Sequence, residues 1–165
     1  MSLLKALKGL FVGASAVAEN VRPESMEDLV FVFGTLKEGF PNFATNRGVR
    51  VAGSFRTCAA YPLYLVGERH VPWLVNSPGL GVQVAGQIFR VDSETLVAMD
   101  RLERVSEPDG YRREVLEVEG GDSPGLLCAY AYLKQPGQLA MSEVRAGPLE
   151  EYKHEHASLY RPRAA

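Results

Sequence analysis

The sequence has few cysteines and no excess of positive charge, and each shortage removes a class of function. Its 165 residues carry 18 Lys and Arg and 20 Asp and Glu, a formal net charge of −2, so no overall basic field would attract nucleic acid. The two cysteines, Cys58 and Cys128, are far apart in the sequence and lie in apolar contexts. They match neither a disulfide framework nor a zinc knuckle, and we expect two buried free thiols.

Motifs for nucleotide or metal chemistry are missing as well. The sequence has no Walker loop, zinc-protease helix or nucleophile elbow, and Gly79-Leu80-Gly81 lacks the third glycine of a dinucleotide fingerprint. His154 and His156 lie among charged residues without a third ligand at a recognisable spacing. The sequence therefore predicts neither a metal site nor a cofactor.

Acidic residues are absent from the first 18 residues, where leucines recur at helical spacing. This pattern predicts a short amphipathic helix, which is too short to span a bilayer. A secretory signal is disfavoured because its apolar run would be only residues 9–13. A mitochondrial transit peptide fits the acid-free pattern better, although the first arginine is Arg22.

The alternative to targeting is an extension that packs on its own domain or makes a peripheral or partner contact through residues 1–18. We expect residues 1–28 to be an amino-terminal extension and linker, and residues 29–165 to be one domain. No integral membrane span is predicted, and a cytoplasmic location is favoured over a mitochondrial one.

The remaining chain reads as short apolar segments separated by Gly, Pro and Asn, with one clear helix. Asp92 or Ser93 can cap that helix, and Leu96, Met99 and Leu102 give it apolar spacing. This pattern predicts an α+β fold, a small curled β-barrel with flanking helices. The expected strands are 29–33, 49–56, 60–66, 83–91, 112–118 and 126–133.

Glu103 shares a helical stripe with Leu96 and Met99, because residues 96, 99 and 103 are spaced i, i+3 and i+7. A carboxylate on a core-facing stripe loses hydration, which raises its pKa toward neutrality and suits it for general acid/base chemistry. Alternatively, the helix ends near Leu102, and Glu103 turns to solvent or pairs with Arg112 or Arg113. For neighbouring Asp100 we expect a supporting or capping role.

The expected buried strand 29–33 is followed by a glycine-bounded turn, Gly34 to Gly39. Such a turn can expose consecutive backbone N–H groups that bind a carboxylate or a developing oxyanion, and Thr35 adds a hydroxyl. A simple turn is the alternative interpretation.

Several separated blocks resemble the γ-glutamyl cyclotransferase-like (AIG2-like) family, and within it the γ-glutamylamine cyclotransferases. The run VFVFGTLKEG is similar to the family's Tyr-Gly-Thr-Leu signature. YPLYLVGERHVPWLVNSPGLGVQVAGQIFRVD, ETLVAMDRLE and GYRRE follow in the family's order, so the resemblance covers about residues 29–133.

The resemblance implies a barrel enzyme that cyclises a small-molecule γ-glutamyl substrate, preferably γ-glutamyl-ε-lysine, to 5-oxoproline and a free amine. It implies Glu103 as the catalytic residue, because MDRLE is similar to the family's LDDFE segment. The substrate-binding residues implied are Phe33, Gly34, Thr35, Leu36, Tyr111 and Tyr132. Phe33 replaces the family's usual tyrosine and lacks its hydroxyl.

Three points stay open at the level of sequence. The amine could belong to a γ-glutamyl amino acid or to glutathione, and a non-catalytic binding module could use the same fold. The irregular-looking stretch from Tyr61 to Pro78, with Trp73 and Asn76, could line the amine side of the site, or Trp73 could be ordinary core.

Overall fold

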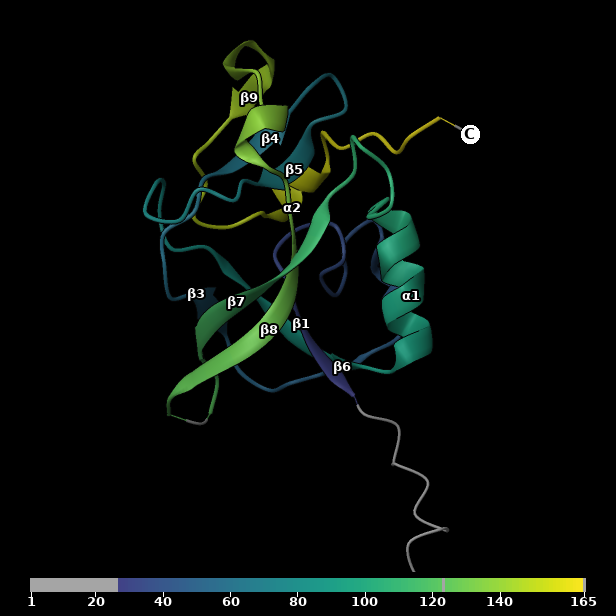
Figure 1. The fold of residues 1–165 in the computed structure, drawn as a ribbon, viewed down its shortest axis with the longest axis vertical. Helices are drawn as coiled ribbons and strands as arrows, with labels where there is room; N and C mark the ends of the chain where they lie inside the picture. The colour runs from purple at the N-terminus through teal and green to yellow at the C-terminus, as the bar shows by residue number, and fades with distance from the viewer. Residues whose placement is uncertain (1–26, 123, 165) are drawn as a thin grey trace, which may run out of the picture.

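A five-stranded barrel, closed on itself, forms the centre of the protein (Figure 1). The computed structural model describes residues 27–122 and 124–164. The strand order is β1-β8-β7-β3-β6, and β6 returns to pair with β1; only the β1–β8 pairing is parallel. The α+β barrel is thus confirmed. Its strands are β1 (Asp28–Val32), β3 (Phe55–Thr57), β6 (Ala85–Val91), β7 (Arg112–Gly120) and β8 (Leu126–Leu133).

A second, three-stranded sheet lies at the end of the barrel where the site forms, in the order β5-β4-β9 (Figure 1). The stretch that looked irregular in the sequence is therefore a regular hairpin, in which Tyr64 pairs with Trp73. The remaining elements are β2 (Val49–Arg50), β4 (Leu63–Val66), β5 (Val71–Leu74), β9 (Val144–Ala146), η1 (Phe43–Thr45), η2 (Pro136–Gln138), η3 (Met141–Glu143), α1 (Ser93–Leu102) and α2 (His154–Ala157).

Strand β1 is buried on both faces, as its continuous apolar run predicts. Phe31 and Phe33 belong to the cluster that fills the barrel. Val30 and Val32 point the other way and pack with the residues beneath α1. The end of β1 is thereby held between the two parts of the core.

Helix α1 begins where the sequence indicates, and it ends at Leu102, as the alternative interpretation of Glu103 supposed. The Asp92 side chain caps it by accepting a 2.8 Å hydrogen bond from the backbone N–H of Thr95. Leu96 and Met99 are buried in the same cluster as Val30 and Val32. The stripe that carries Glu103 therefore does face the barrel.

The predicted strand 49–56 is wrong as a single element, because the chain breaks it into β2 and β3. Gly53 lies between them with φ +105°, a conformation that side chains rarely adopt. A Cβ at Gly53 would come within 2.4 Å of the Gly121 Cα. The break is thus caused by a close crossing of two backbone segments.

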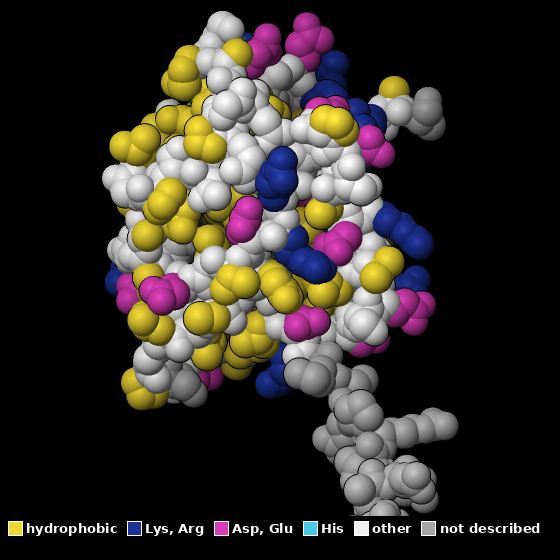
Figure 2. All heavy atoms as spheres, in the orientation of Figure 1, with side chains coloured by type: hydrophobic (Ala, Val, Ile, Leu, Met, Phe, Trp, Pro, Cys, Tyr) yellow, Lys and Arg dark blue, Asp and Glu magenta, His cyan; other side chains and the backbone are white. Residues whose placement is uncertain are grey.

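The expectation of two buried thiols is also wrong: Cys58 is half-buried and Cys128 is exposed. Cys128 lies near the start of β8, where the outer face of the strand is apolar but exposed, whereas Tyr132, further along the same face, is buried against α1. Figure 2 shows apolar side chains gathered over β7 and β8, where Val115 and Leu126 are each 59% exposed. Apolar sequence context did not distinguish the two faces of this strand.

The proposed extension 1–28 lies almost wholly outside the described residues, so its predicted helix and role stay predictions. Within residues 27–122 and 124–164, no helix combines the length and the apolar character needed to cross a membrane.

Candidate active site

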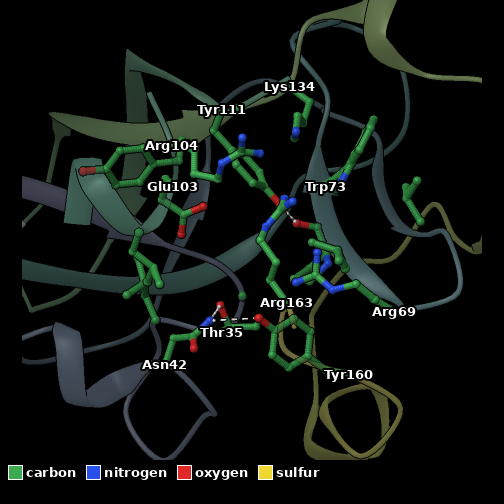
Figure 3. A pocket seen from close by; sticks show the side chains of 18 of the residues that line it. Thr35, Asn42, Arg69, Trp73, Glu103, Arg104, Tyr111, Lys134, Tyr160 and Arg163 are labelled. Carbon is green, nitrogen blue, oxygen red and sulfur yellow. Dashed lines mark hydrogen bonds between the residues drawn. The ribbon is translucent and has the colours of Figure 1, made fainter. Parts of the chain in front are cut away.

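A pocket of about 1050 Å³ opens between the barrel and the small sheet (Figure 3). The end of β1, the hairpin β4–β5, the loop after α1 and the C-terminal segment 158–164 form its walls. All seven site residues named from the sequence line it. They are Phe33, Gly34, Thr35, Leu36, Glu103, Tyr111 and Tyr132.

The turn after β1 lines this pocket, and two of its backbone donors have no backbone partner among the described residues. The N–H of Lys37 donates to the Gly34 carbonyl at 3.1 Å, which closes the turn. The N–H groups of Thr35 and Leu36 donate to no backbone carbonyl of the described residues. Position 34 has to be glycine, since a Cβ there would lie 2.9 Å from the Pro72 side chain on β5. The turn can therefore bind an anion.

Asn42 ties this turn to the C-terminal segment. Its side-chain amide donates to the Thr35 hydroxyl at 2.9 Å and to the Tyr160 hydroxyl at 3.3 Å (Figure 3). Its backbone N–H donates to the Thr35 carbonyl at 2.8 Å. Thr35 is thus oriented by Asn42, and one wall of the pocket is joined to another.

Lys37 fixes the other end of the turn from inside the protein. Its ammonium donates to the Tyr152 carbonyl and lies 4.2 Å from the centre of the Phe40 ring. Burial lowers the pKa of Lys37, while Glu151 opposes the shift. We conclude that Lys37 has a structural role at this site.

The backbone around Glu103 is held in place on both sides. Its N–H makes the last helical bond, to the Met99 carbonyl at 2.9 Å, and its carbonyl accepts from the Tyr111 N–H at 3.0 Å. Arg104 then adopts φ +54°, a left-handed conformation that ends the helix. Gly110 permits the return of the loop, because a Cβ there would lie 1.7 Å from the Arg104 carbonyl oxygen.

The Glu103 side chain is half-buried and its carboxylate points into the pocket (Figure 3). The helix does end at Leu102, as the alternative supposed, but Arg113 pairs with Asp100 rather than with Glu103. No described residue forms an ion pair with the Glu103 carboxylate. Burial raises its pKa to about 7, against the opposing charge of Lys134.

Lys134 is held in the pocket by two aromatic rings. Its ammonium lies 4.4 Å from the Trp73 ring centre and 4.6 Å from that of Tyr111, and it donates to the Asp109 carbonyl. Burial lowers the pKa of Lys134 to about 8, and the charge of Glu103 acts against that shift. Lys134 is thus a cation that favours the ionised form of Glu103.

Asp100 has the supporting position expected of it. It accepts 2.7 Å hydrogen bonds from the Arg113 guanidinium and from the Tyr132 hydroxyl. The hydroxyl of Tyr111 donates to the Pro72 carbonyl at 2.8 Å. Tyr111 and Tyr132 therefore have their hydroxyl protons engaged by the protein, and burial raises the pKa of each.

Sequence reasoning missed several polar residues of this pocket. Lys134 follows Tyr132 by two residues at the end of an extended strand, and that spacing could have indicated a shared face. Trp73, left open between specificity and core, lines the pocket, whereas Asn76 does not. The others come from loops or, for Gln138, from the short helix η2, and they gave no local signal: Asn42, Arg69, Arg104, Gln138, Tyr160 and Arg163.

Clusters of side chains able to hold a metal ion were not found in the part of the chain that is described. His154, one of the two histidines considered above, instead stacks on Phe40 with ring centres 4.3 Å apart.

The fold is that of a known enzyme family. The model of the family described as "Gamma-glutamyl cyclotransferase, AIG2-like" matches residues 30–157, and the chain belongs to this family. The resemblance read from the sequence blocks is thereby confirmed.

Individual relatives agree with this assignment. The chain is 40% identical over 114 residues to gamma-glutamylaminecyclotransferase B of Danio rerio, covering 64% of this chain but only 59% of that protein. It is 36% identical over 143 residues to gamma-glutamylaminecyclotransferase of Bos taurus, covering 81% and 82% of the two chains. The crystal structure of an AIG2-like protein from Mus musculus superposes with a TM-score of 0.69 at 29% identity, covering 84% of this chain and 98% of that one.

Proposed function

We propose that the protein is a γ-glutamylamine cyclotransferase that converts γ-glutamyl-ε-lysine to 5-oxoproline and free lysine. The observation that carries the proposal is the Glu103 carboxylate, which lies in the pocket without an ion-pair partner among residues 27–122 and 124–164 and has a pKa of about 7. The names of the relatives from Danio rerio and Bos taurus point to the same reaction.

The reaction needs no nucleophile from the protein. The α-amine of the glutamyl group attacks its own γ-carbonyl, a new C–N bond closes the five-membered ring, and the γ-amide C–N bond breaks. The enzyme therefore has to fold the glutamyl arm into a reactive shape, which is where orientation gives its advantage. The pocket walls around Phe33, Tyr111 and Tyr132 are suited to this task.

Glu103 moves the proton. As a carboxylate it accepts a proton from the α-ammonium, and as an acid it delivers that proton to the nitrogen of the departing amine. The attacking nitrogen loses a second proton when the ring closes, and this proton ends on the released amine, which leaves as an ammonium, so the protons balance without a cofactor. A bare amide anion is a very poor leaving group, hence the need for the second step. A pKa of about 7 lets Glu103 perform both steps near neutral pH.

The N–H groups of Thr35 and Leu36 supply partial positive charge that can bind the negative groups of the substrate. They have no backbone acceptor among the described residues, and they line the same pocket as Glu103. Such donors bind either the substrate α-carboxylate or the oxyanion that forms when the γ-carbonyl is attacked. In both cases the turn after β1 holds the glutamyl group against Glu103.

The test is to incubate the full chain with γ-glutamyl-ε-lysine and to measure 5-oxoproline and lysine by mass spectrometry. The native protein should release both in equal amounts. A panel of γ-glutamyl amino acids and glutathione tests whether the enzyme prefers one of these compounds as its substrate instead. If no γ-glutamyl compound yields 5-oxoproline although the ligand binds by calorimetry, the chain is a binding module and the proposal is wrong.

A further inference from the structure

The C-terminal segment of the pocket wall lies beyond the family match. That match ends at residue 157, whereas Tyr160, Pro162 and Arg163 line the pocket. The segment is attached to the turn of the β4–β5 hairpin by two hydrogen bonds. The Arg161 N–H donates to the Arg69 carbonyl at 3.0 Å, and the Arg69 Nε donates to the Arg161 carbonyl at 2.9 Å.

Two basic side chains in this part of the pocket have no acidic partner. Arg104 is paired with Asp109 at 2.8 Å, and Lys134 lies between its two aromatic rings. Arg69 and Arg163, by contrast, form no ion pair with any residue of the described ranges. In Figure 3 the side chains of both extend into the pocket.

Arg163 also acts on the interior of the site. Its charge contributes to lowering the pKa of both Lys134 and Asp109, so its guanidinium lies within electrostatic reach of them. A pocket of about 1050 Å³ matches the upper range of small-molecule sites, roughly 300–1,000 Å³, and has room for more than a glutamyl group. The region of Arg69 and Arg163 is therefore available to the other half of the substrate.

We propose that Arg163, together with Arg69, is a specificity determinant that binds a carboxylate on the leaving amine. A guanidinium can pair with a carboxylate through two parallel hydrogen bonds, and two guanidiniums that have no acidic partner among the described residues are suited to an anionic group. This inference rests on the proposed function, since it assigns the Glu103 end of the pocket to the glutamyl group. It selects amines that carry a carboxylate, such as lysine, over amines that lack one.

Two substrates that differ only in this carboxylate test the inference: γ-glutamyl-ε-lysine and γ-glutamyl-cadaverine. The native protein should show a kcat/KM at least roughly tenfold higher for the lysine compound, the effect of a lost charge-assisted hydrogen bond. Arg163→Ala should reduce this ratio to about threefold or less, mainly by raising KM for the lysine compound. The matched control is Arg161→Ala, which removes the same charge from the same segment but from a side chain that does not line the pocket.

The outcomes separate the inference from the proposed function. If Arg163→Ala lowers kcat/KM equally for both substrates, or leaves their ratio at the native value, Arg163 does not bind the carboxylate and the inference is wrong. If Arg161→Ala lowers the ratio of the two kcat/KM values as much as Arg163→Ala does, the effect comes from the positive charge of the segment in general. The inference is then wrong as well. If the native protein converts neither substrate while other γ-glutamyl compounds are also inert, the proposed function itself has failed.

Discussion

Two carboxylates at the end of α1, three residues apart, have opposite surroundings. Asp100 faces the outside of β7 and β8, where Arg113 and Tyr132 each donate to it at 2.7 Å. Glu103 lies in the pocket, where no described residue pairs with it and burial raises its pKa to about 7. Asp100 is therefore fixed by its hydrogen-bond partners, whereas Glu103 is free to contact a substrate. Pairing, rather than burial alone, distinguishes the structural acid from the reactive one.

The largest effect should follow from removing the acid/base group. Glu103→Gln keeps the size of the side chain but cannot accept the α-ammonium proton, so kcat should fall by on the order of 10²–10⁴. Steady-state 5-oxoproline release measures this. Glu107→Gln, an exposed change in the same loop, is the control and should retain native turnover. A Glu103→Gln protein with near-native kcat would sink the assignment of Glu103.

Asp100→Asn should give the opposite profile, with a loss of stability and little loss of rate. The substitution weakens a part-buried ion pair and a tyrosine hydrogen bond, and we expect the free energy of unfolding to fall by about 1–3 kcal/mol. Chemical denaturation measures this, while kcat should stay within about tenfold of native. Glu38→Gln is the control, because its exposed pair with Arg50 should contribute less than about 1 kcal/mol. A rate loss as large as that of Glu103→Gln would remove the distinction between the two acids.

Much of this comparison could be predicted from local sequence. The spacing of Leu96, Met99 and Glu103 placed the carboxylate on the stripe that faces the barrel, and the Asp92 cap fixed the start of the helix. These are properties of one helix, and helical geometry determines them whatever the rest of the chain does.

Features that depend on contacts between distant segments could not be predicted. The exposure of Cys128 depends on whether anything covers the outer face of β8. The break in the strand 49–56 depends on Gly53 meeting Gly121. Arg163 reaches the pocket on a segment that is hydrogen-bonded to Asn42 and to Arg69, and Arg69 lies 92 residues from Arg161. No local pattern records such contacts.

The raised pKa of Glu103 should make the stability of the protein depend on pH. The pKa of Glu103 is raised from 4.5 to about 7 in the folded protein, so between these values the folded state binds more protons than the unfolded state. The native protein should therefore lose stability as pH rises from about 4.5 to 7. Glu103→Gln stays neutral, and it should be more stable than native by about 1–3 kcal/mol at pH 8 but equal to native at pH 4.

Denaturant titrations at the two pH values check this prediction. Glu107→Gln should show no such pH-dependent gain, since Glu107 is exposed. If Glu103→Gln gains the same stability at pH 4 as at pH 8, the effect comes from packing, and the Glu103 carboxyl group is not titrating near neutrality.

The smallest effect concerns the cation that acts on Glu103. Lys134 favours the ionised carboxylate, so Lys134→Met should raise the pKa of Glu103 further and move the acid limb of the kcat/KM profile to higher pH. We expect a shift of about 0.5–1 pH unit, the size of one charge interaction in a partly solvated site. Lys153→Met removes an exposed lysine outside the pocket and should leave the limb in place. If the acid limb of Lys134→Met stays fixed or moves to lower pH, Lys134 does not lower the pKa of Glu103. Its role would then be to pack between the two aromatic rings, and the difference between Glu103 and Asp100 would not depend on this cation.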